Sequence, residues 1–396
     1  MSTSGNSYDL TTFANAFKRA FIDDDKVDLF LFDSPLLDSI KVTDGFVGTD
    51  EERVRATSFM GGYGYGSLAR PNESNLIRPR LEAKKFYARS MVDVESMASA
   101  MNDRGAFFEL VARVKEDMRR AIQNGMSLAL TKTNIDHELV LGVIATSGVA
   151  TTATAGQYEL TLTDLHKPNF HKKQIVSIED GNTDLFEVTA LTDALVTVDR
   201  LTGSQVPVAG DEIMLQGSDG NAFMGLPGVT AQSGTLYNVT IADGWKANVT
   251  DKNGAAITEH DLYNVLLDVH LEAGSQPDVI ACGLDQYKKI AEFLANKRVL
   301  NDQSDAMGHS GLTLATDKGN IKVIWDRHIE NDTIYFLNSK YMELRKRPLS
   351  GIVNAGGDIL LPDYINDQDR YHIVYRCYGN FYLEPTYMAK LHNLAQ

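Results

Sequence analysis

The spacing of apolar residues changes several times along this chain of 396 residues. Near its start, four apolar residues recur at helical spacing and predict an amphipathic helix in an N-terminal arm. They are Leu10, Phe13, Phe17 and Phe21. A longer apolar stripe with a charged opposite face lies between the start signal Asn102-Asp103 and the stop signal Asn124-Gly125. It predicts a helix of about twenty residues, roughly 30 Å long.

The segment between these two helices, residues 53–92, has a different pattern. Two extended stretches of alternating polar and apolar residues flank the glycine-rich run Gly61–Gly66. This pattern predicts a two-stranded ribbon with a sharply turning tip. An isolated ribbon of this kind is only marginally stable in water, and this one has few apolar residues to bury. We therefore expect it to lie on a neighbouring subunit.

From Gln157 to Gln216 the apolar period shortens to two, which is typical of strands. Five short strands are expected, at Tyr158–Leu162, Gln174–Ile178, Leu185–Val188, Ala194–Val198 and Glu212–Leu215. Glycine-containing turns separate several of them. The pattern predicts a small antiparallel sheet or barrel inserted into the chain.

The remainder of the chain alternates between helices and strands. Thr258, with Asp261 three residues later, resembles a capping box that starts a helix ended by Gly274. A buried strand at Asp278–Cys282 and a helix at Leu284–Leu294 follow. Two more pairs of strands are expected, Ile321–Trp325 with Thr333–Leu337 as a hairpin, and Tyr371–Cys377 with Gly379–Leu383.

Composition narrows the range of functions. The net charge is −15 and the pI is about 5.0, so the chain is a poor general binder of nucleic acid, whose phosphates are bound mainly by Lys and Arg. The two cysteines, Cys282 and Cys377, are too few for a disulfide framework and favour buried thiols. No secretory signal is recognisable, and no apolar run approaches the roughly 20 residues that cross a bilayer. Synthesis in a cytoplasm is expected.

The charges are unevenly distributed. Residues 1–52 hold four basic and eleven acidic residues, a net charge of −7, whereas residues 53–89 hold eight basic and two acidic residues, a net charge of +6. The basic residues of the ribbon are Arg53, Arg55, Arg70, Arg78, Arg80, Lys84, Lys85 and Arg89. They either keep exposed strands soluble or bind an acidic neighbour, where complementary charge would set the register.

Candidate chemistry is sparse. His166 and His171 lie five residues apart without a third metal ligand in sequence, so no metal site is predicted. The glycines at 62, 64 and 66 lack the preceding strand and following helix of a phosphate-binding loop. The trio Asp326-Arg327-His328 lies in a predicted loop and is better explained as a hydrated turn than as a catalytic site. No catalytic residue, metal or cofactor is therefore predicted.

The order of these parts resembles the tailed-phage major capsid proteins, which share the Hong Kong ninety-seven-type fold. An N-terminal arm, a projecting ribbon, a long helix and an α/β portion follow one another over nearly the whole chain. Three local stretches are similar too: Gly225–Val229 with Gly234-Thr235, Pro277–Cys282 with Tyr287–Ile290, and Gly319–Asp326 with Asp332–Leu337. The resemblance implies an α+β fold with an N-arm, an E-loop, a P-domain with a long spine helix and an A-domain, plus an inserted small β domain.

The implied units are an N-terminal arm (1–50), an E-loop ribbon (51–92), a P-domain with the spine helix (93–157), an inserted β domain (158–218), an A-domain and return (219–345), and C-terminal strands shared by the P-domain and A-domain (346–396). The apolar face of the arm, Phe13, Phe17 and Phe21, is expected to dock on a neighbouring subunit or a scaffold.

The resemblance also implies a function without enzymatic activity. Copies of the chain would assemble as pentamers and hexamers into the icosahedral shell of a virion, in the host cytoplasm, around double-stranded viral DNA. The implied partners are the chain itself, scaffolding and portal proteins, a decoration protein, and packaged DNA through non-specific contacts, with no membrane. The main alternative is an encapsulin-like nanocompartment shell that holds a cargo enzyme. Further alternatives are a surface-binding protein built around residues 158–218 and a hydrolase with a site near His328.

Overall fold

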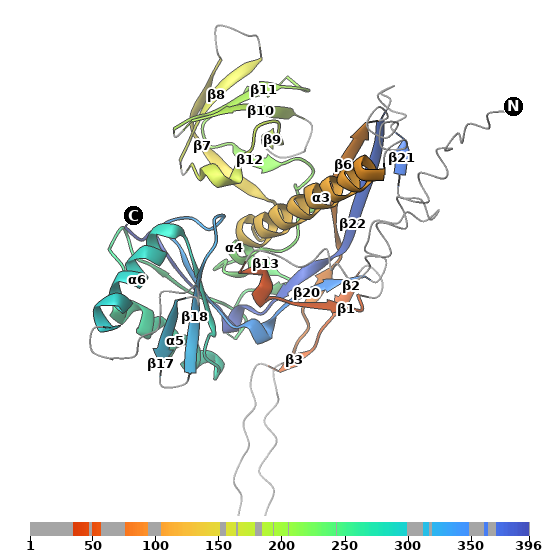
Figure 1. The fold of residues 1–396 in the computed structure, drawn as a ribbon. Coiled ribbons are helices and arrows are strands. Elements are labelled where there is room, and N and C mark those ends of the chain that lie inside the picture. The colour runs from red at the N-terminus through yellow and green to blue at the C-terminus, as the bar shows by residue number, and fades with distance from the viewer. Residues whose placement is uncertain are drawn as a thin grey trace, which may run out of the picture.

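The computed structural model describes residues 35–46, 50–56, 76–93, 104–150, 156–163, 165–178, 184–192, 194–204, 206–242, 244–298, 312–316, 319–347, 360–362 and 370–395. Four parts can be followed in Figure 1. A long helix lies beside a mixed sheet, which we call the P-domain sheet. A closed β-barrel, a second sheet covered by two helices (the A-domain) and a short two-stranded ribbon are the other main parts.

The long helix α3 (Arg104–Lys132) passes the predicted stop at Asn124-Gly125 and continues through Lys132. The prediction was wrong because the residues after Gly125 are buried in the core, and their packing outweighs the weak local stop signal. Gly125 instead allows a close approach, since a Cβ atom there would lie 2.5 Å from the ring of Phe86. Among the helices described, none is both long and apolar enough to cross a membrane.

The P-domain sheet has five strands, and its longest strand lies at its centre. The strands are β1 (Lys41–Asp44), β20 (Met342–Lys346), β22 (Arg370–Leu383), β21 (Leu360–Pro362) and β6 (Lys84–Asp93). Strand β22 pairs antiparallel with β20, β21 and β6. The two strands predicted around residue 378 are therefore one continuous strand. Gly379 lets β22 pass β20, since a Cβ atom there would lie 2.1 Å from the carbonyl oxygen of Arg345.

The region that the sequence predicts as an inserted β domain forms a closed barrel with the strand order β10-β11-β8-β7-β12-β9. Its strands are β7 (Val140–Ala150), β8 (Gln157–Leu162), β9 (Ile175–Ile178), β10 (Leu185–Leu191), β11 (Val196–Arg200) and β12 (Glu212–Leu215). Each of the five predicted strands is present, but the barrel begins at Val140, before residue 158. Strand β7 was missed because its register shifts against both of its neighbours, which breaks the period of two.

The A-domain sheet has the order β15-β23-β19-β16-β18-β17. Its strands are β15 (Asn248–Asp251), β23 (Ala389–His392), β19 (Ile334–Leu337), β16 (Val279–Cys282), β18 (Gly319–Trp325) and β17 (Thr313–Thr316). The predicted hairpin of β18 and β19 is wrong, because β16 lies between them. All four residues of β16 are buried, and a central position suits such an apolar strand.

Helices α5 (Glu259–Ala273) and α6 (Leu284–Arg298) pack on one face of the A-domain sheet. The capping box of α5 is confirmed, because the side chain of Thr258 accepts a hydrogen bond from the backbone N–H of Asp261 while the Asp261 carboxylate bonds back to the backbone of Thr258. Gly274 ends the helix with a φ of 68°. The opposite face of the sheet contributes Val279 and Ala281 to the core shared with the P-domain and the barrel.

The described residues include only the base of the ribbon. Strand β2 (Asp50–Glu52) pairs antiparallel with β5 (Arg80–Glu82), and β3 (Arg55–Ala56) pairs with β4 (Leu76–Ile77). Residues 84–93 leave the ribbon and form β6 of the P-domain sheet. The smaller elements are η1 (Leu37–Ser39), η2 (Lys167–Asn169), α4 (Leu226–Val229), β13 (Thr235–Leu236), β14 (Val239–Thr240), η3 (Ser339–Tyr341) and η4 (Pro385–Tyr387).

Candidate inter-subunit site at the base of the ribbon

The base of the ribbon is held to the body by one buried apolar residue. In the β2–β5 pair, Glu51 lies opposite Leu81 and Glu52 lies opposite Arg80. Leu81 is buried in the core, while its neighbours Arg80 and Glu82 are exposed. Alternation along the strand thus anchors the ribbon through Leu81 and leaves its charged side chains on the outside.

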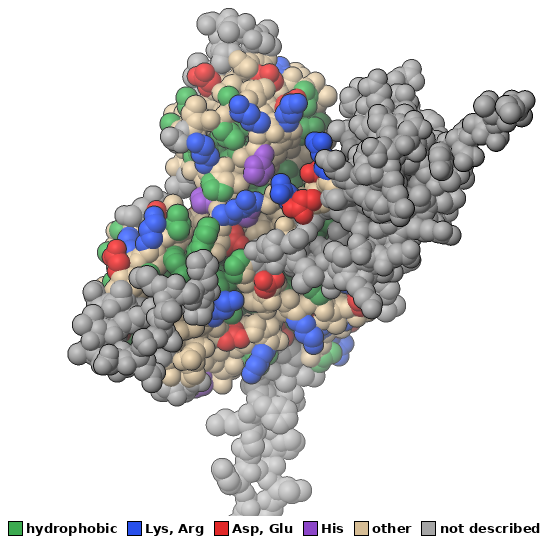
Figure 2. Space-filling view, viewed as in Figure 1, with side chains coloured by type: hydrophobic (Ala, Val, Ile, Leu, Met, Phe, Trp, Pro, Cys, Tyr) green, Lys and Arg blue, Asp and Glu red, His purple; other side chains and the backbone are tan. Residues whose placement is uncertain are grey.

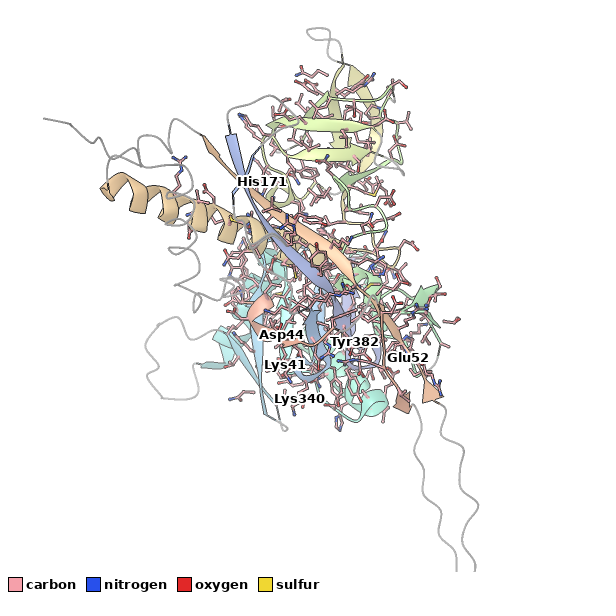
Figure 3. All side chains as sticks on the ribbon, turned by 90° about the vertical axis from the view of Figure 1, so that its right-hand side faces the viewer. Lys41, Asp44, Glu52, His171, Lys340 and Tyr382 are labelled. Atoms are coloured by element: carbon pink, nitrogen blue, oxygen red, sulfur yellow. The ribbon has the colours of Figure 1, made fainter. Side chains whose placement is uncertain are left out.

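A half-buried network of two arginines and two glutamates joins the ribbon to the P-domain sheet. Arg53 Nη2 donates to Glu343 Oε2 at 2.8 Å, and Arg53 Nε lies 3.3 Å from Glu51 Oε1. Arg345 binds the same Glu51 carboxylate through two nitrogens, at 2.7 Å and 3.1 Å. The guanidinium of Arg53 also lies 4.2 Å from the ring centroid of Tyr382. Figure 3 shows Glu52, where the ribbon leaves the body, and Tyr382 on strand β22.

The network favours the charged form of Arg53. Burial disfavours its charged form, but the hydrogen bond and the charge of Glu343 outweigh burial, so the pKa of Arg53 lies above its ordinary value. Charge-assisted bonds of this geometry are stronger than isolated surface pairs. Arg53 therefore positions the ribbon within its own subunit.

Two further predicted cations form exposed pairs across the ribbon. Arg80 binds the carboxylate of Asp50, and Arg78 Nη1 lies 3.7 Å from Glu52 Oε1. Exposed pairs of this kind contribute at most about 1 kcal/mol each. They can therefore exchange their partner for an acidic group on another molecule at small cost.

The other predicted residues are more widely placed. Lys84 Nζ donates to the carbonyl oxygen of Gly220 at 2.9 Å, and Lys85 Nζ lies 5.9 Å from the ring centroid of Tyr378. Arg55 and Arg89 are placed on β3 and β6, but their side chains lie outside the described residues, as does Arg70. The arm residues Phe13, Phe17 and Phe21 also lie outside them.

Sequence reasoning missed the acidic half of the site. Its charge count grouped Glu51 and Glu52 with the acidic residues 1–52, although Glu52 lies opposite Arg80 in the ribbon and pairs with Arg78. It had no means of finding Glu343 and Arg345, which are nearly three hundred residues away in sequence. At the base of the ribbon, much of the basic charge is thus balanced within the chain.

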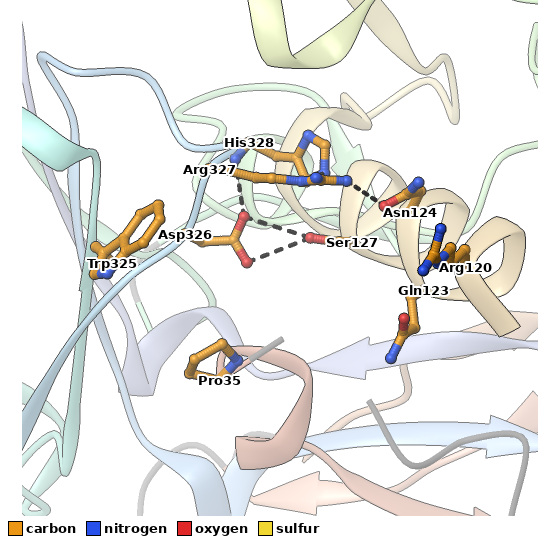
Figure 4. A pocket seen from close by; sticks show the side chains of 9 residues that line it. All are labelled: Pro35, Arg120, Gln123, Asn124, Ser127, Trp325, Asp326, Arg327 and His328. Atoms are coloured by element: carbon orange, nitrogen blue, oxygen red, sulfur yellow. Dashed lines mark hydrogen bonds between the residues drawn. The ribbon is translucent and has the colours of Figure 1, made fainter. Parts of the chain in front are cut away.

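The trio Asp326-Arg327-His328 lies beside α3 in the cavity of Figure 4. Ser127 Oγ donates to the carboxylate of Asp326 at 3.3 Å. His328 Nε2 lies 3.0 Å from Arg327 Nε, and its Nδ1 bonds to Asn169 Oδ1 of the barrel. Both ring nitrogens of His328 are thus engaged away from Ser127, and the group has no nucleophile–base pair.

Burial and then the charge of Arg327 lower the pKa of His328 to about 3, so its ring is neutral. The other histidines of interest, His166 and His171, lie on the barrel loop that faces this trio. The described residues contain no group of three or more His, Cys, Asp or Glu able to hold a metal. Both cysteines are free and buried.

Comparison with solved structures defines the class of fold. The chain is similar to a chain of the structure titled Cyanophage A-1(L) capsid asymmetric unit, with a TM-score of 0.51 and 12% identity, over 93% of this chain and 95% of that chain. Structures from Gordonia phage Cozz (TM-score 0.44, 10% identity, 92% and 87% coverage) and Mycobacterium phage Cain (0.42, 10%, 91% and 90%) have lower TM-scores. The fold is that of a tailed-phage capsid protein, as the sequence predicted.

A family model adds independent evidence from sequence. Residues 201–349 match the model of the SU10 major capsid protein family. No curated protein matches the chain significantly. The predicted resemblance to tailed-phage major capsid proteins is therefore confirmed, and capsid shell formation is the function that these findings support.

Proposed function

We propose that copies of this chain assemble as pentamers and hexamers and close into an icosahedral shell around double-stranded DNA. One observation carries the proposal: a capsid fold that extends over 93% of the chain, with a major capsid family match across residues 201–349. A shell protein needs many weak contacts of moderate area, and simultaneous contacts multiply into a stable particle.

The charge of the chain suits a container for DNA. Its net charge is −15, so packed DNA would be retained without tight binding to the wall. Scaffolding and portal proteins, and a decoration protein on the outside, are proposed as partners during assembly in the host cytoplasm. We expect the role to be structural and non-enzymatic, since the trio near Ser127 has no nucleophile–base pair.

The ribbon is proposed to act in two parts. Its base is fixed within the subunit by Leu81 and Arg53, so the exposed pairs of Arg78 and Arg80 face outward at a defined position. Among the described side chains of the basic cluster, Arg78, Arg80 and Lys85 are exposed, so an acidic neighbour can reach them. The aromatic residues of the arm are proposed to dock on a neighbouring subunit or a scaffold.

The experiment is negative-stain electron microscopy of the purified chain, alone and with scaffold from the same source, followed by analysis of the particle contents. Closed shells, or pentamers and hexamers, are the expected result. A monodisperse monomer under every condition would overturn the proposal. An enclosed enzyme in particles from the natural source would favour the nanocompartment, whereas enclosed DNA supports the virion.

A further inference from the structure

Helix α5 presents an unusual outer face. Leu271 is 85% exposed and Leu267, one turn earlier, is 59% exposed, although their helix has buried leucines and valines on its other side. The helix carries four acidic residues and no Lys or Arg. Two of the acids, Asp268 and Glu272, each follow one of these leucines and are exposed as well. The face is therefore an apolar ridge bordered by negative charge.

A cavity elsewhere on the same chain has the complementary character. It lies between α3 and the end of β18 and has a volume of about 580 Å³ (Figure 4). Pro35 and Trp325 give it apolar walls, and Trp325 is 45% exposed. Figure 2 shows hydrophobic side chains gathered on the visible face of the A-domain next to the barrel.

The rim of this cavity is basic. Arg120 and Arg327 both line it and are exposed. Arg120 pairs with Glu116 one turn earlier on α3, and Arg327 binds the side-chain oxygen of Asn124. The carboxylate in the cavity, Asp326, is buried and accepts hydrogen bonds from Ser127 Oγ and the backbone N–H of His328. Positive charge therefore dominates where an incoming group would first meet the cavity.

The ridge and the cavity lie at different places on the A-domain. Helix α5 contacts β15 and η4, whereas Trp325 ends β18, and three strands separate β15 from β18 in the sheet. A contact between two different surfaces of identical subunits is heterologous, and it closes into a ring when the rotation between copies allows. The two surfaces thus suit a ring of copies better than a two-fold dimer.

We propose that the α5 ridge of one copy docks in the Trp325 cavity of the next copy. Leu267 and Leu271 contact Trp325 and Pro35, and Asp268 and Glu272 face Arg327 and Arg120 across the rim. Buried aromatic and arginine residues surrounded by a polar rim are typical of the energetic centre of interfaces. The inference rests on the proposed function, since it describes a contact within the rings from which a shell is built.

Disulfide trapping tests the contact on the full chain. Glu272→Cys combined with Arg327→Cys places one thiol on each side of the rim and keeps the apolar side chains of the contact, while the native cysteines are buried. Mild oxidation of assembled particles is expected to give a ladder that runs past the dimer on a non-reducing gel. Each single variant is expected to run as a monomer on the same gel. Dimers from Glu272→Cys alone would mean that α5 packs on itself, and an unlinked double variant would mean that the surfaces do not meet; either result overturns the proposal.

Polar substitution of the ridge gives a second measurement that does not depend on cross-linking. Leu267→Ser with Leu271→Ser should leave the fold unchanged, because both side chains are exposed, and should lower the yield of closed shells by about tenfold or more. Leu201→Ser on the barrel, which removes a leucine that is 47% exposed, is the matched control and should assemble normally. Unimpaired assembly of the double variant would refute the role of the ridge.

Exchange of the charges at Arg327 and Glu272 tests the proposed ion pair at the rim of the cavity. Arg327→Glu is expected to block assembly by repelling Glu272, and Glu272→Arg in the same chain is expected to restore it. Failure of the second change to rescue the first would contradict this pairing. If the wild-type chain forms no shells under any condition, the proposed function fails; if it does and the variants behave like it, only this inference fails.

Discussion

His328 Nδ1 lies 3.0 Å from Asn169 Oδ1, and this hydrogen bond joins a buried side chain on a loop of the A-domain to a buried side chain on a loop of the barrel. Arg327 can only donate, so its Nε–H at 3.0 Å makes His328 Nε2 an acceptor. His328 Nδ1 therefore carries the proton and donates it to Asn169. Protonation of His328 Nε2 would place two hydrogen-bond donors, Arg327 Nε–H and His328 Nε2–H, opposite each other.

Acid should weaken the joint between the barrel and the A-domain. Burial and Arg327 lower the pKa of His328 from 6.5 to about 3. Between these values the unfolded chain binds a proton that the folded chain does not. Stability is therefore fully present above about pH 6.5 and falls as the pH decreases, by up to about 1.4 kcal/mol per pH unit. The pKa values of His166 and His171, on the facing loop, are lowered by burial too, which adds to the effect.

The measurement is urea unfolding of the wild-type chain and of His328→Gln between about pH 7 and pH 4. Glutamine can accept from Arg327 and donate to Asn169 but does not titrate in this range, so the variant should lose less stability on acidification. Carboxylates elsewhere affect both proteins equally and cancel in the comparison. Parallel losses in the two proteins would show that His328 is not the titrating group.

The capping box of α5 should make a measurable contribution to stability. Thr258→Ala removes the acceptor for the Asp261 backbone N–H and should lower the free energy of unfolding by about 1 kcal/mol. Thr258→Ser keeps the oxygen and serves as the control. Chemical denaturation of both variants decides the point, and an alanine variant as stable as the serine variant would mean that the cap is dispensable.

Local sequence patterns were sufficient to predict an element wherever its apolar residues keep one constant spacing. The cap of α5 and five barrel strands were predicted because hydrogen-bonding residues and alternating burial leave a direct mark on the sequence. Strand β7 interrupts its own alternation with register shifts and therefore left no such mark. Gly125 looked like the end of the long helix, although it serves a close contact with Phe86, which is distant in sequence.

Long-range pairing could not be predicted in the same way. The order β19-β16-β18 depends on which strand gains most from a central position, and a sequence shows only that each is apolar. The charges of the ribbon are a second example. A count along the chain separates an acidic arm from a basic ribbon, but Glu51 of the first group holds Arg53 of the second and Arg345 of the P-domain.

The N-terminal arm is predicted to act after the subunit has folded. Deletion of residues 1–25 should leave folded rings that close poorly, because the apolar face of the arm is expected to dock on a neighbouring subunit or a scaffold. Substitution of Phe13, Phe17 and Phe21 by serine, with the arm length unchanged, should have the same effect. Sedimentation and electron microscopy separate rings from shells. Normal closure of both variants would remove the arm from assembly.

Variants of the exposed ion pairs of the ribbon can show whether these charges act within their own chain or on a neighbouring chain. Reversing Arg78, Arg80, Lys84 and Lys85 together should block or misdirect assembly, but this change also breaks the in-chain contacts of Arg78, Arg80 and Lys84. A sharper variant exchanges partners, with Arg80→Asp and Asp50→Arg in one chain. The exchange keeps an ion pair across β2 and β5, while the positions of positive and negative charge seen by a neighbour are reversed.

The exchanged chain should fold like the wild type, since exposed pairs contribute at most about 1 kcal/mol. If an acidic neighbour binds the ribbon, the exchanged chain should assemble more slowly than the wild type, and its assembly should be less sensitive to salt. Complementary charge speeds the encounter of two subunits and sets their register. Light scattering during assembly, at low and at high ionic strength, measures both effects. If the exchanged chain assembles with wild-type kinetics at both ionic strengths, Arg80 forms ion pairs only within its own ribbon, and the contacts with the neighbour lie elsewhere.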